Sequence, residues 1–138
     1  MDERPRKIIL YDGVCALCNW FVETILPLDK HEQFYFVSQQ SELAGTLMAK
    51  HQITLPPLES IVFLDEESRK VFTKSQALFQ IGKHLGGIWK ILSTGFSFLF
   101  PRAIADYLYD IVARNRYKTF GKYDTCPLPD PKYRKRFL

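Results

Sequence analysis

The stretch that decides the fold is "KIILYDGVCALCNWFVETIL", residues 7–26. It starts as a short apolar run rich in β-branched residues, breaks at Asp12-Gly13, and continues with apolar residues at helical spacing. Two of the chain's three cysteines, Cys15 and Cys18, lie at the start of the helical part. The stretch therefore predicts a strand, a tight turn, and a helix that opens with a Cys-x-x-Cys pair.

Length and composition point to a compact chain. The sequence has 138 residues, of which 46% are hydrophobic and 25% are charged, so we expect a single domain over residues 1–138. The net charge is +4, and basic residues gather near both ends, in "RPRK" at 4–7 and "KYRKR" at 132–136. Charge loaded at chain ends is typical of solvated tails, and we expect no nucleic-acid partner.

The chain carries no evident targeting or membrane-spanning segment. Its first seven residues are polar and the apolar run after them is short, so the sequence predicts a cytoplasmic protein. The most apolar later segment, residues 86–100, contains Lys90 and falls short of the roughly 20 residues that a transmembrane helix needs. Three cysteines are too few for a disulfide scaffold, so the Cys-x-x-Cys pair is reactive, metal-binding or incidental.

Apolar periodicity and turn residues predict the order of the remaining elements. The first helix should run from Cys15 to the proline at Pro27. The other expected strands are 34–37, 60–64 and 70–73, and the other expected helices are one capped by Ser38 or Ser41 that runs through Met48, one capped by Ser75 that runs through Leu85, 88–100, and 101–116. This order, β-α-β-α-β-β-α, is that of an α/β thioredoxin-like sheet with a C-terminal helical extension.

The extension and basic tail cover residues 88–138, within the same domain. Its apolar residues recur at helical spacing, so we expect the two helices of 88–116 to pack on one another and against the sheet. Aromatic residues in excess of that packing would form a surface for a partner.

Thiol chemistry explains why two cysteines would stand at a helix start. Backbone N–H groups and the helix dipole favour the thiolate of Cys15 in the first turn. Cys18, one turn further on the apolar side, should be more buried and less ionised. An exposed nucleophile beside a shielded resolving thiol is what disulfide exchange requires. The structural alternative is that both cysteines are simply small apolar residues of a helix.

The sequence also resembles a known family, the DCC family of thiol-disulfide oxidoreductases, also called DUF393. The resemblance rests on "YDGVCALC" at 11–18, "SQAL" at 75–78 and "PRAIADYLYDIVARNRYKTFGKYDTCPLP" at 101–129. The family's Asp-x-x-Cys-x-x-Cys pattern is matched by Asp12, Cys15 and Cys18. The resemblance implies a thioredoxin-like fold, dithiol chemistry, and a substrate that is a protein disulfide or a low-molecular-weight thiol compound.

Three further residues have two interpretations each. Asp12 could accept the proton of the buried thiol or could cap the loop before the helix. Arg116, with Arg114, could bind a substrate anion, or could complement the negative end of a helix. Cys126 could act as an additional resolving thiol or could be a packed residue.

The loop before the third strand departs from the thioredoxin plan. Thioredoxins place a cis-proline immediately before that strand, where it helps to bind substrate backbone. Here that position is Ser60, and the nearest prolines, Pro56 and Pro57, come earlier. Ser60 is therefore the candidate substrate-docking residue, on a loop that is rearranged or lacks a cis-proline.

Two other function classes remain open. Cys15, Cys18 and Cys126 could hold zinc or iron, although a closed zinc site takes four ligands and no fourth is evident, so we assign no metal ligand. Alternatively, the chain is a non-catalytic thioredoxin-like adaptor that uses the aromatic 88–100 helix to dock a partner or a membrane surface. No nucleotide-binding motif occurs, so we expect no cofactor, and any NAD(P)H or flavin would belong to an external reductant system.

Overall fold

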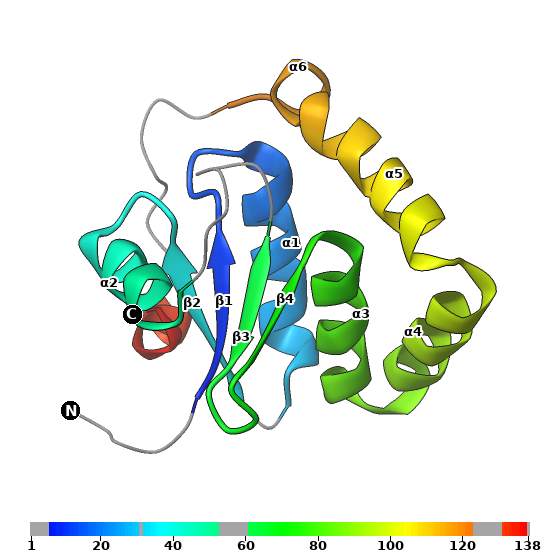
Figure 1. Cartoon of the computed structure of the whole chain (residues 1–138). Helices are drawn as coiled ribbons and strands as arrows, with labels where there is room; N and C mark the ends of the chain where they lie inside the picture. Colours follow the sequence, from blue (N-terminus) through cyan, green and yellow to red (C-terminus); the bar gives the residue numbers. More distant parts are fainter. Residues whose placement is uncertain (1–5, 31, 53–60, 123–130, 138) are drawn as a thin grey trace.

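The computed structural model describes residues 6–30, 32–52, 61–122 and 131–137. In this part of the chain, four strands form one sheet in the order β2-β1-β3-β4 (Figure 1). The strands are β1 (Lys7–Tyr11), β2 (Phe34–Ser38), β3 (Val62–Asp65) and β4 (Lys70–Thr73). β2 runs parallel to β1, β3 runs antiparallel to it, and β4 pairs antiparallel with β3. The predicted order of elements along the chain and the thioredoxin-like fold class are confirmed.

Helices cover both faces of the sheet because β1 is apolar on both sides. Ile9 and Tyr11 face the cluster that contains Val22 of α1 (Ala16–Leu28) and Ile81 of α3 (Lys74–Leu85). Ile8 and Leu10 belong to the second cluster, with Leu47 of α2 (Glu42–Lys50). Alternate residues of a strand point to opposite faces, so this run of apolar residues fills both cores.

The first helix is longer than expected. We expected Pro27 to end it, but α1 continues to Leu28. Proline lacks the N–H that would bond the carbonyl of Glu23, and both residues are solvent-exposed, where water can satisfy that group. The chain then leaves the helix one residue later, so Pro27 removes a single hydrogen bond and does not break the helix.

The two predicted N-caps have different outcomes. Ser41 caps α2, and its hydroxyl accepts from the N–H of Ala44 at 3.2 Å. Ser75 does not cap α3, because that helix begins at Lys74 after Thr73. The carboxylate of Asp106, from the distant α5 (Arg102–Arg114), accepts from the backbone N–H of Ser75 at 3.3 Å instead. A group supplied by another helix therefore does what a local cap usually does.

The C-terminal helices pack differently from our expectation. α4 (Gly87–Leu99) follows Gly86 and Gly87, whose positive φ angles of 76° and 55° let the chain reverse after α3. α4 and α5 both pack mainly on α3, and among the described residues they form no comparable interface with each other or with a strand. Figure 1 shows them on the outer side of α3. No helix in the described ranges is long and apolar enough to cross a membrane.

The basic tail is not simply a solvated end. Residues Pro131–Arg136 form a 3-10 helix, η1, that packs on β2. Arg136 is buried, pairs with the buried Asp29, and donates from Nε to the carbonyl of Phe34 at 2.9 Å. The Asp29 carboxylate, which follows α1, therefore holds this end of the chain on the core through its ion pair with Arg136. The sequence pattern did not indicate this pair.

Candidate functional site

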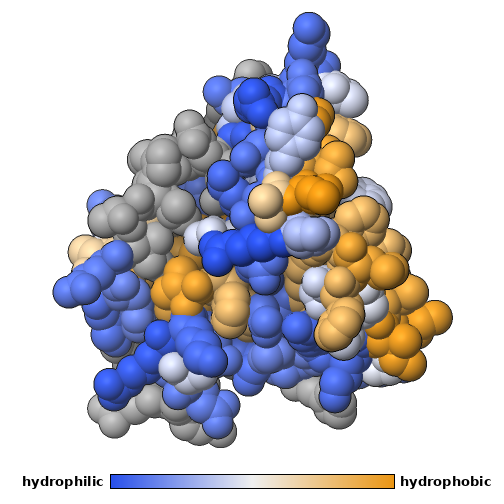
Figure 2. Space-filling view, turned by 45° about the vertical axis from the view of Figure 1, so that its right-hand side comes forward, coloured by the Kyte–Doolittle hydropathy of each residue, from blue (hydrophilic) through white to orange (hydrophobic). Residues whose placement is uncertain are grey.

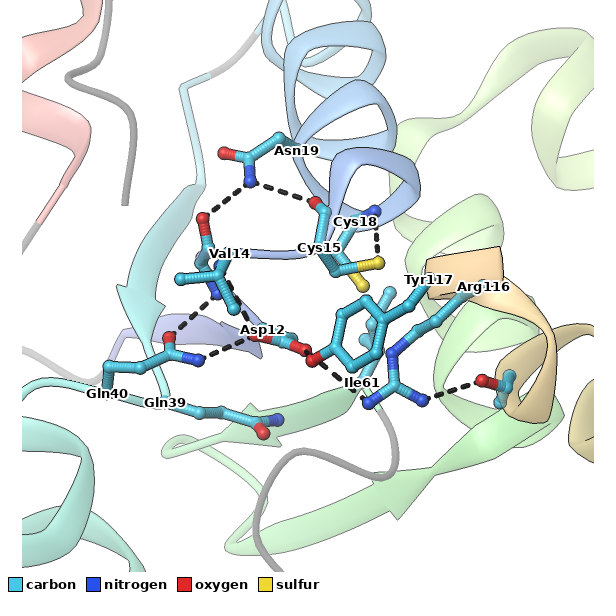
Figure 3. A network of polar contacts seen from close by, with 12 residues as sticks. Asp12, Val14, Cys15, Cys18, Asn19, Gln39, Gln40, Ile61, Arg116 and Tyr117 are labelled. Atoms are coloured by element: carbon cyan, nitrogen blue, oxygen red, sulfur yellow. Dashed lines mark hydrogen bonds and ion pairs between the residues drawn. The ribbon is translucent and has the colours of Figure 1, made fainter. Parts of the chain in front are cut away.

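The two cysteines of the Cys-x-x-Cys pair lie side by side at the start of α1 (Figure 3). Cys15 is the N-cap residue, and its Sγ accepts a hydrogen bond from the backbone N–H of Cys18 at 3.4 Å. Both are free thiols. The first turn of α1 contains no acidic side chain to oppose a thiolate there. The predicted position of Cys15 at the helix start is confirmed.

The environment separates the acidities of the two thiols. A hydrogen bond from the side chain of Cys18 lowers the pKa of Cys15 from 9.0 to about 6, against the opposing effect of burial. Backbone N–H groups at the helix start and the charge of Arg116 also contribute to this lowered pKa. The pKa of Cys18 is raised, because its proton is held by Cys15 and its side chain is buried. At neutral pH the pair is therefore one thiolate and one thiol.

The expected difference in exposure is absent. We expected Cys15 to be exposed, but it is 0% exposed and Cys18 is 9% exposed. Cys15 belongs to the core cluster that contains Val22 and Phe36. In addition, the end of α6 (Arg116–Phe120) lies against the helix start, where the N–H of Ala16 donates to the carbonyl of Gly121 at 3.2 Å. The positive φ of Gly121, 96°, turns the chain so that Lys122 forms a β-bridge with Cys15. A segment about one hundred residues away thus covers the thiolate.

Asp12 is the centre of the polar network beside the cysteines (Figure 3). It is buried, and its Oδ1 accepts from the N–H of Val14 at 3.2 Å and from Nε2 of Gln40 at 2.6 Å. Its Oδ2 accepts from the hydroxyl of Tyr117 and from Arg116 at 3.4 Å. The bond to Val14 is the loop-capping contact that we considered, and the other donors compensate the cost of burying the carboxylate.

Arg116 and Tyr117 connect α6 to this network. The Arg116 side chain is 12% exposed, donates to the carbonyl of Ala113 at 2.8 Å, and lies 4.6 Å from the ring centre of Tyr117. Burial, together with the hydrogen bond to Asp12, raises the pKa of Tyr117 to about 12, so its hydroxyl remains a donor. The contacts that Arg116 makes here are with groups of the chain itself.

An apolar cavity of about 430 Å³ adjoins the second cysteine. Cys18, Asp12 and Arg116 lie in its wall, and apolar residues from α1, α3 and α5 supply most of the rest, among them Leu17, Phe21, Leu78, Leu108 and Val112. Such a volume is in the range of small-ligand sites. The cavity exists because α5 packs on α3 and leaves a gap between itself and α1.

Comparison with known proteins decides the family. A family model described as DCC1-like thiol-disulfide oxidoreductase matches residues 9–122. The chain belongs to the DCC1-like thiol-disulfide oxidoreductase family. It is 38% identical to the uncharacterized protein YuxK of Bacillus subtilis (strain 168) over 137 residues, 99% of this chain and 97% of that protein. It is also 32% identical over 127 residues to the chloroplastic DCC family protein At1g52590 of Arabidopsis thaliana, covering 92% and 72% of the two chains. No solved structure matches it.

The loop before β3 is only partly visible in this DCC-family chain. Ser60, Pro56 and Pro57 lie outside the described residues, and no peptide bond within the described ranges is cis. At Ile61, the next residue, the backbone N–H donates to the hydroxyl of Tyr109 at 2.8 Å. Burial raises the pKa of Tyr109 to about 12. The backbone N–H next to the predicted docking position is therefore already hydrogen-bonded to a tyrosine of α5.

The metal-binding alternative depends on residues that are only partly described. Within the described ranges, no three His, Cys, Asp or Glu residues are grouped to hold a metal ion. Cys126, the third thiol of that alternative, lies outside them.

Sequence reasoning missed three residues of the site. Gln40 joins Asp12 to the turn at Gly13, whose N–H donates to Oε1 of Gln40 at 2.8 Å. Tyr109 and Tyr117 reach the site from α5 and α6. The available signal was the block at 101–129, which resembles the family and contains both tyrosines.

Proposed function

We propose that this chain is a thiol-disulfide oxidoreductase that reduces a disulfide of a protein or of a low-molecular-weight compound. The observation that carries the proposal is the pairing of a lowered pKa at Cys15, the N-cap of α1, with a raised pKa at Cys18. A thiolate attacks and a retained thiol resolves, so the two unequal thiols suit the two halves of an exchange cycle.

The proposed exchange has two steps. The Cys15 thiolate attacks one sulfur of the substrate disulfide, the S–S bond breaks, and the first substrate thiolate leaves and takes a proton from water. Cys18 then loses its proton and attacks Sγ of Cys15, which releases the second substrate thiol and leaves a Cys15–Cys18 disulfide. Two electrons have passed to the substrate, and an external dithiol reductant restores the protein.

Asp12 and Arg116 have supporting roles in this proposal. Asp12 is the carboxylate of the site and would accept the proton of Cys18, while its bonds to the loop hold the helix start in place. Arg116 lies in the cavity wall and forms an ion pair with Asp12. A substrate carboxylate in the cavity would therefore bind the same guanidinium group as Asp12. Ser60 stays a proposed docking residue on the evidence of its sequence position alone.

Substrate access has two parts. The cavity beside Cys18 would take an apolar portion of the substrate, next to the disulfide to be reduced. Cys15 itself is covered by the Gly121–Lys122 segment, so attack requires that this segment move. This segment continues directly from α6, which Arg116 and Tyr117 attach to Asp12, and its own contact with the helix start is the bridge between Cys15 and Lys122.

The test uses a chromogenic aromatic disulfide and variants in a Cys126→Ser background, which leaves only the two site thiols. The reduced parent should release two coloured thiolates per protein and end as an intramolecular disulfide. Cys18→Ser should release one and retain the mixed disulfide, seen as a mass adduct. Cys15→Ser should react far more slowly. Equal rates for Cys15→Ser and Cys18→Ser would contradict the assigned roles.

A further inference from the structure

Helix α4 packs with its polar side inward. None of its residues is buried, and its two half-buried side chains are Ser93 and Ser97. It approaches α3 closely at Gly82, where an added Cβ would lie 1.7 Å from Oγ of Ser93. A surface helix of a globular protein usually buries its apolar side, whereas the half-buried side of α4 carries serines.

Several apolar residues of α4 point outward, whereas Trp89, Leu92 and Phe96 are 42%, 42% and 49% exposed. Phe98 is 91% exposed, Leu99 76% and Ile91 72%. The exposed apolar residues continue onto α5, and together they form what we call the α4–α5 apolar face, whose principal members are Ile88, Ile91, Phe98, Leu99, Ile104 and Ile111. Figure 2 shows hydrophobic side chains gathered on this side of the molecule. Exposed clusters of this kind mark interaction surfaces.

The same part of the chain carries an excess of positive charge. Residues 87–122 contain six Lys or Arg and two Asp, a net charge of +4 that equals the net charge of the whole sequence. Both aspartates interact with the first turn of α3: Asp106 with Ser75, and Asp110 with Nζ of Lys74 at 3.1 Å. Two of the six basic residues are paired, Arg116 with the buried Asp12 and Arg102 with Asp106. The exposed basic residues of this part of the chain include Lys90 of α4, Arg114 of α5 and Lys118 of α6.

We infer that the α4–α5 apolar face is a docking surface for an anionic phospholipid bilayer. Apolar side chains beside Lys and Arg are what an interfacial helix presents to acyl chains and lipid phosphates. α4 has 13 residues, too few to span, so it would lie in the plane of the interface. A second copy would bring one positively charged face against another, which disfavours self-association through this surface.

Docking would also place the redox site at the membrane surface. Leu108 and Val112 of α5 are exposed and also line the cavity beside Cys18. The binding itself needs no cysteine, so its failure and the failure of the proposed thiol chemistry are separate results.

The test is co-sedimentation of the full-length protein with two kinds of vesicle, phosphatidylcholine alone and equal parts of phosphatidylcholine and phosphatidylglycerol. We expect binding to the anionic vesicles that weakens with added salt, and little binding to phosphatidylcholine. The sequence has two tryptophans, so Trp20→Phe leaves Trp89 of α4 as the single tryptophan, which can be excited selectively. Its emission should shift to shorter wavelength on binding.

Matched variants distinguish binding through the α4–α5 apolar face from binding through the overall positive charge of the protein. Lys90→Glu with Lys118→Glu should weaken binding by about tenfold or more, whereas Lys50→Glu with Lys70→Glu makes the same charge change at exposed positions elsewhere and should have a much smaller effect. Ile91→Ser with Phe98→Ser should weaken it by about tenfold or more at unchanged charge.

Three results would overturn the inference. One is the absence of binding to anionic vesicles. Another is equal loss of binding from both pairs of lysine substitutions, since that indicates charge without a defined face. The third is a concentration-dependent dimer that shifts Trp89 emission in the absence of lipid, because a second copy would then cover the face.

Discussion

At the residue scale, the reactivity of Cys15 depends on the groups that stabilise its thiolate. A carboxylate beside a thiolate opposes ionisation, whereas the helix start favours it. Here Arg116 and Tyr117 both bond to Oδ2 of Asp12, and Arg116 also acts electrostatically on Cys15. The hydrogen bond from Cys18 is nevertheless the largest influence on the pKa of Cys15. In the proposed mechanism, the second cysteine would therefore activate the first as well as resolve its product.

This ranking predicts unequal effects of two substitutions. Cys18→Ala removes the largest stabilising contact of the Cys15 thiolate, so its pKa should rise from about 6 toward 9.0. Arg116→Gln removes a smaller influence and should raise the pKa less. The measurement is the ultraviolet absorbance of the thiolate against pH, in the Cys126→Ser background. A larger rise for Arg116→Gln than for Cys18→Ala would contradict the account.

The sequence contained part of this site. The spacing of Cys15 and Cys18 and their place after Asp12-Gly13 were enough to predict a helix start with paired thiols. The burial of Cys15 was not predictable, because Gly121 and the residues beside it come from the far end of the chain. Nothing in local periodicity reports a contact over such a separation.

At the element scale, the contact of α3 with α4 depends on a glycine. An added methyl group at Gly82 would meet Ser93 Oγ at 1.7 Å and Cβ at 2.9 Å. Rotation of the Ser93 hydroxyl can relieve the first contact, but the second requires a shift of the α4 backbone. The position of the α4–α5 apolar face thus follows from one residue without a side chain.

Gly82→Ala is therefore expected to destabilise the protein by about 1–3 kcal/mol, measured as the free energy of unfolding in urea. Gly45→Ala, in the exposed part of α2, is the matched control, because nothing lies within 4 Å of the added Cβ. That substitution should stabilise by about 0.5–1 kcal/mol through helix propensity. Adding Ser93→Gly should recover part of the loss at Gly82, and an unchanged or stabilised Gly82→Ala protein would show that the helices do not meet there.

Element boundaries show where local rules are sufficient. The four strands and the Ser41 cap followed from apolar runs and turn residues. The cap of α3 did not, because Asp106 supplies it from another helix. Residues 88–116 form helices as predicted. The prediction that these helices pack on one another and against the sheet was wrong, because both pack mainly on α3.

At the scale of the whole molecule, the C-terminal end is fastened to the core by a buried charge pair. Arg136 of η1 and Asp29 at the end of α1 are 107 positions apart and both are buried. Asp29 also accepts from the backbone N–H of Phe34 at 2.9 Å, so its carboxylate belongs to the start of β2 as well. The end of the chain therefore contributes to the core and not only to surface charge.

Arg136→Met should destabilise the protein by about 3–5 kcal/mol, because it leaves the Asp29 carboxylate buried without its partner. Arg134→Met, an exposed arginine of the same 3-10 helix, should change the free energy of unfolding by less than about 0.5 kcal/mol. The double variant Asp29→Asn with Arg136→Met should recover much of the loss. If Arg134→Met and Arg136→Met lost similar stability, the buried pair would not be what fastens this end.

The overall topology was the most predictable property, because each β1 residue that faces one core alternates with one that faces the other. A strand that is apolar on both faces belongs in the interior of a sheet, as β1 does, and the short hairpin that joins β3 to β4 makes these two strands neighbours. Long-range polar pairs such as Arg136 with Asp29 leave no periodic trace in the sequence, so the fastening of the tail was not predictable.

The central claim is that Cys15 and Cys18 form a redox-active dithiol, and its most direct test is to map the disulfide after mild oxidation of the reduced, full-length protein. Under a glutathione redox buffer, peptide mapping should find Cys15 linked to Cys18 within one chain, with Cys126 still open to alkylation. Metal content of the freshly purified protein should be negligible. Persistence of both Cys15 and Cys18 as thiols in oxidant, or protection of all three cysteines by a stoichiometric metal ion, would contradict the account.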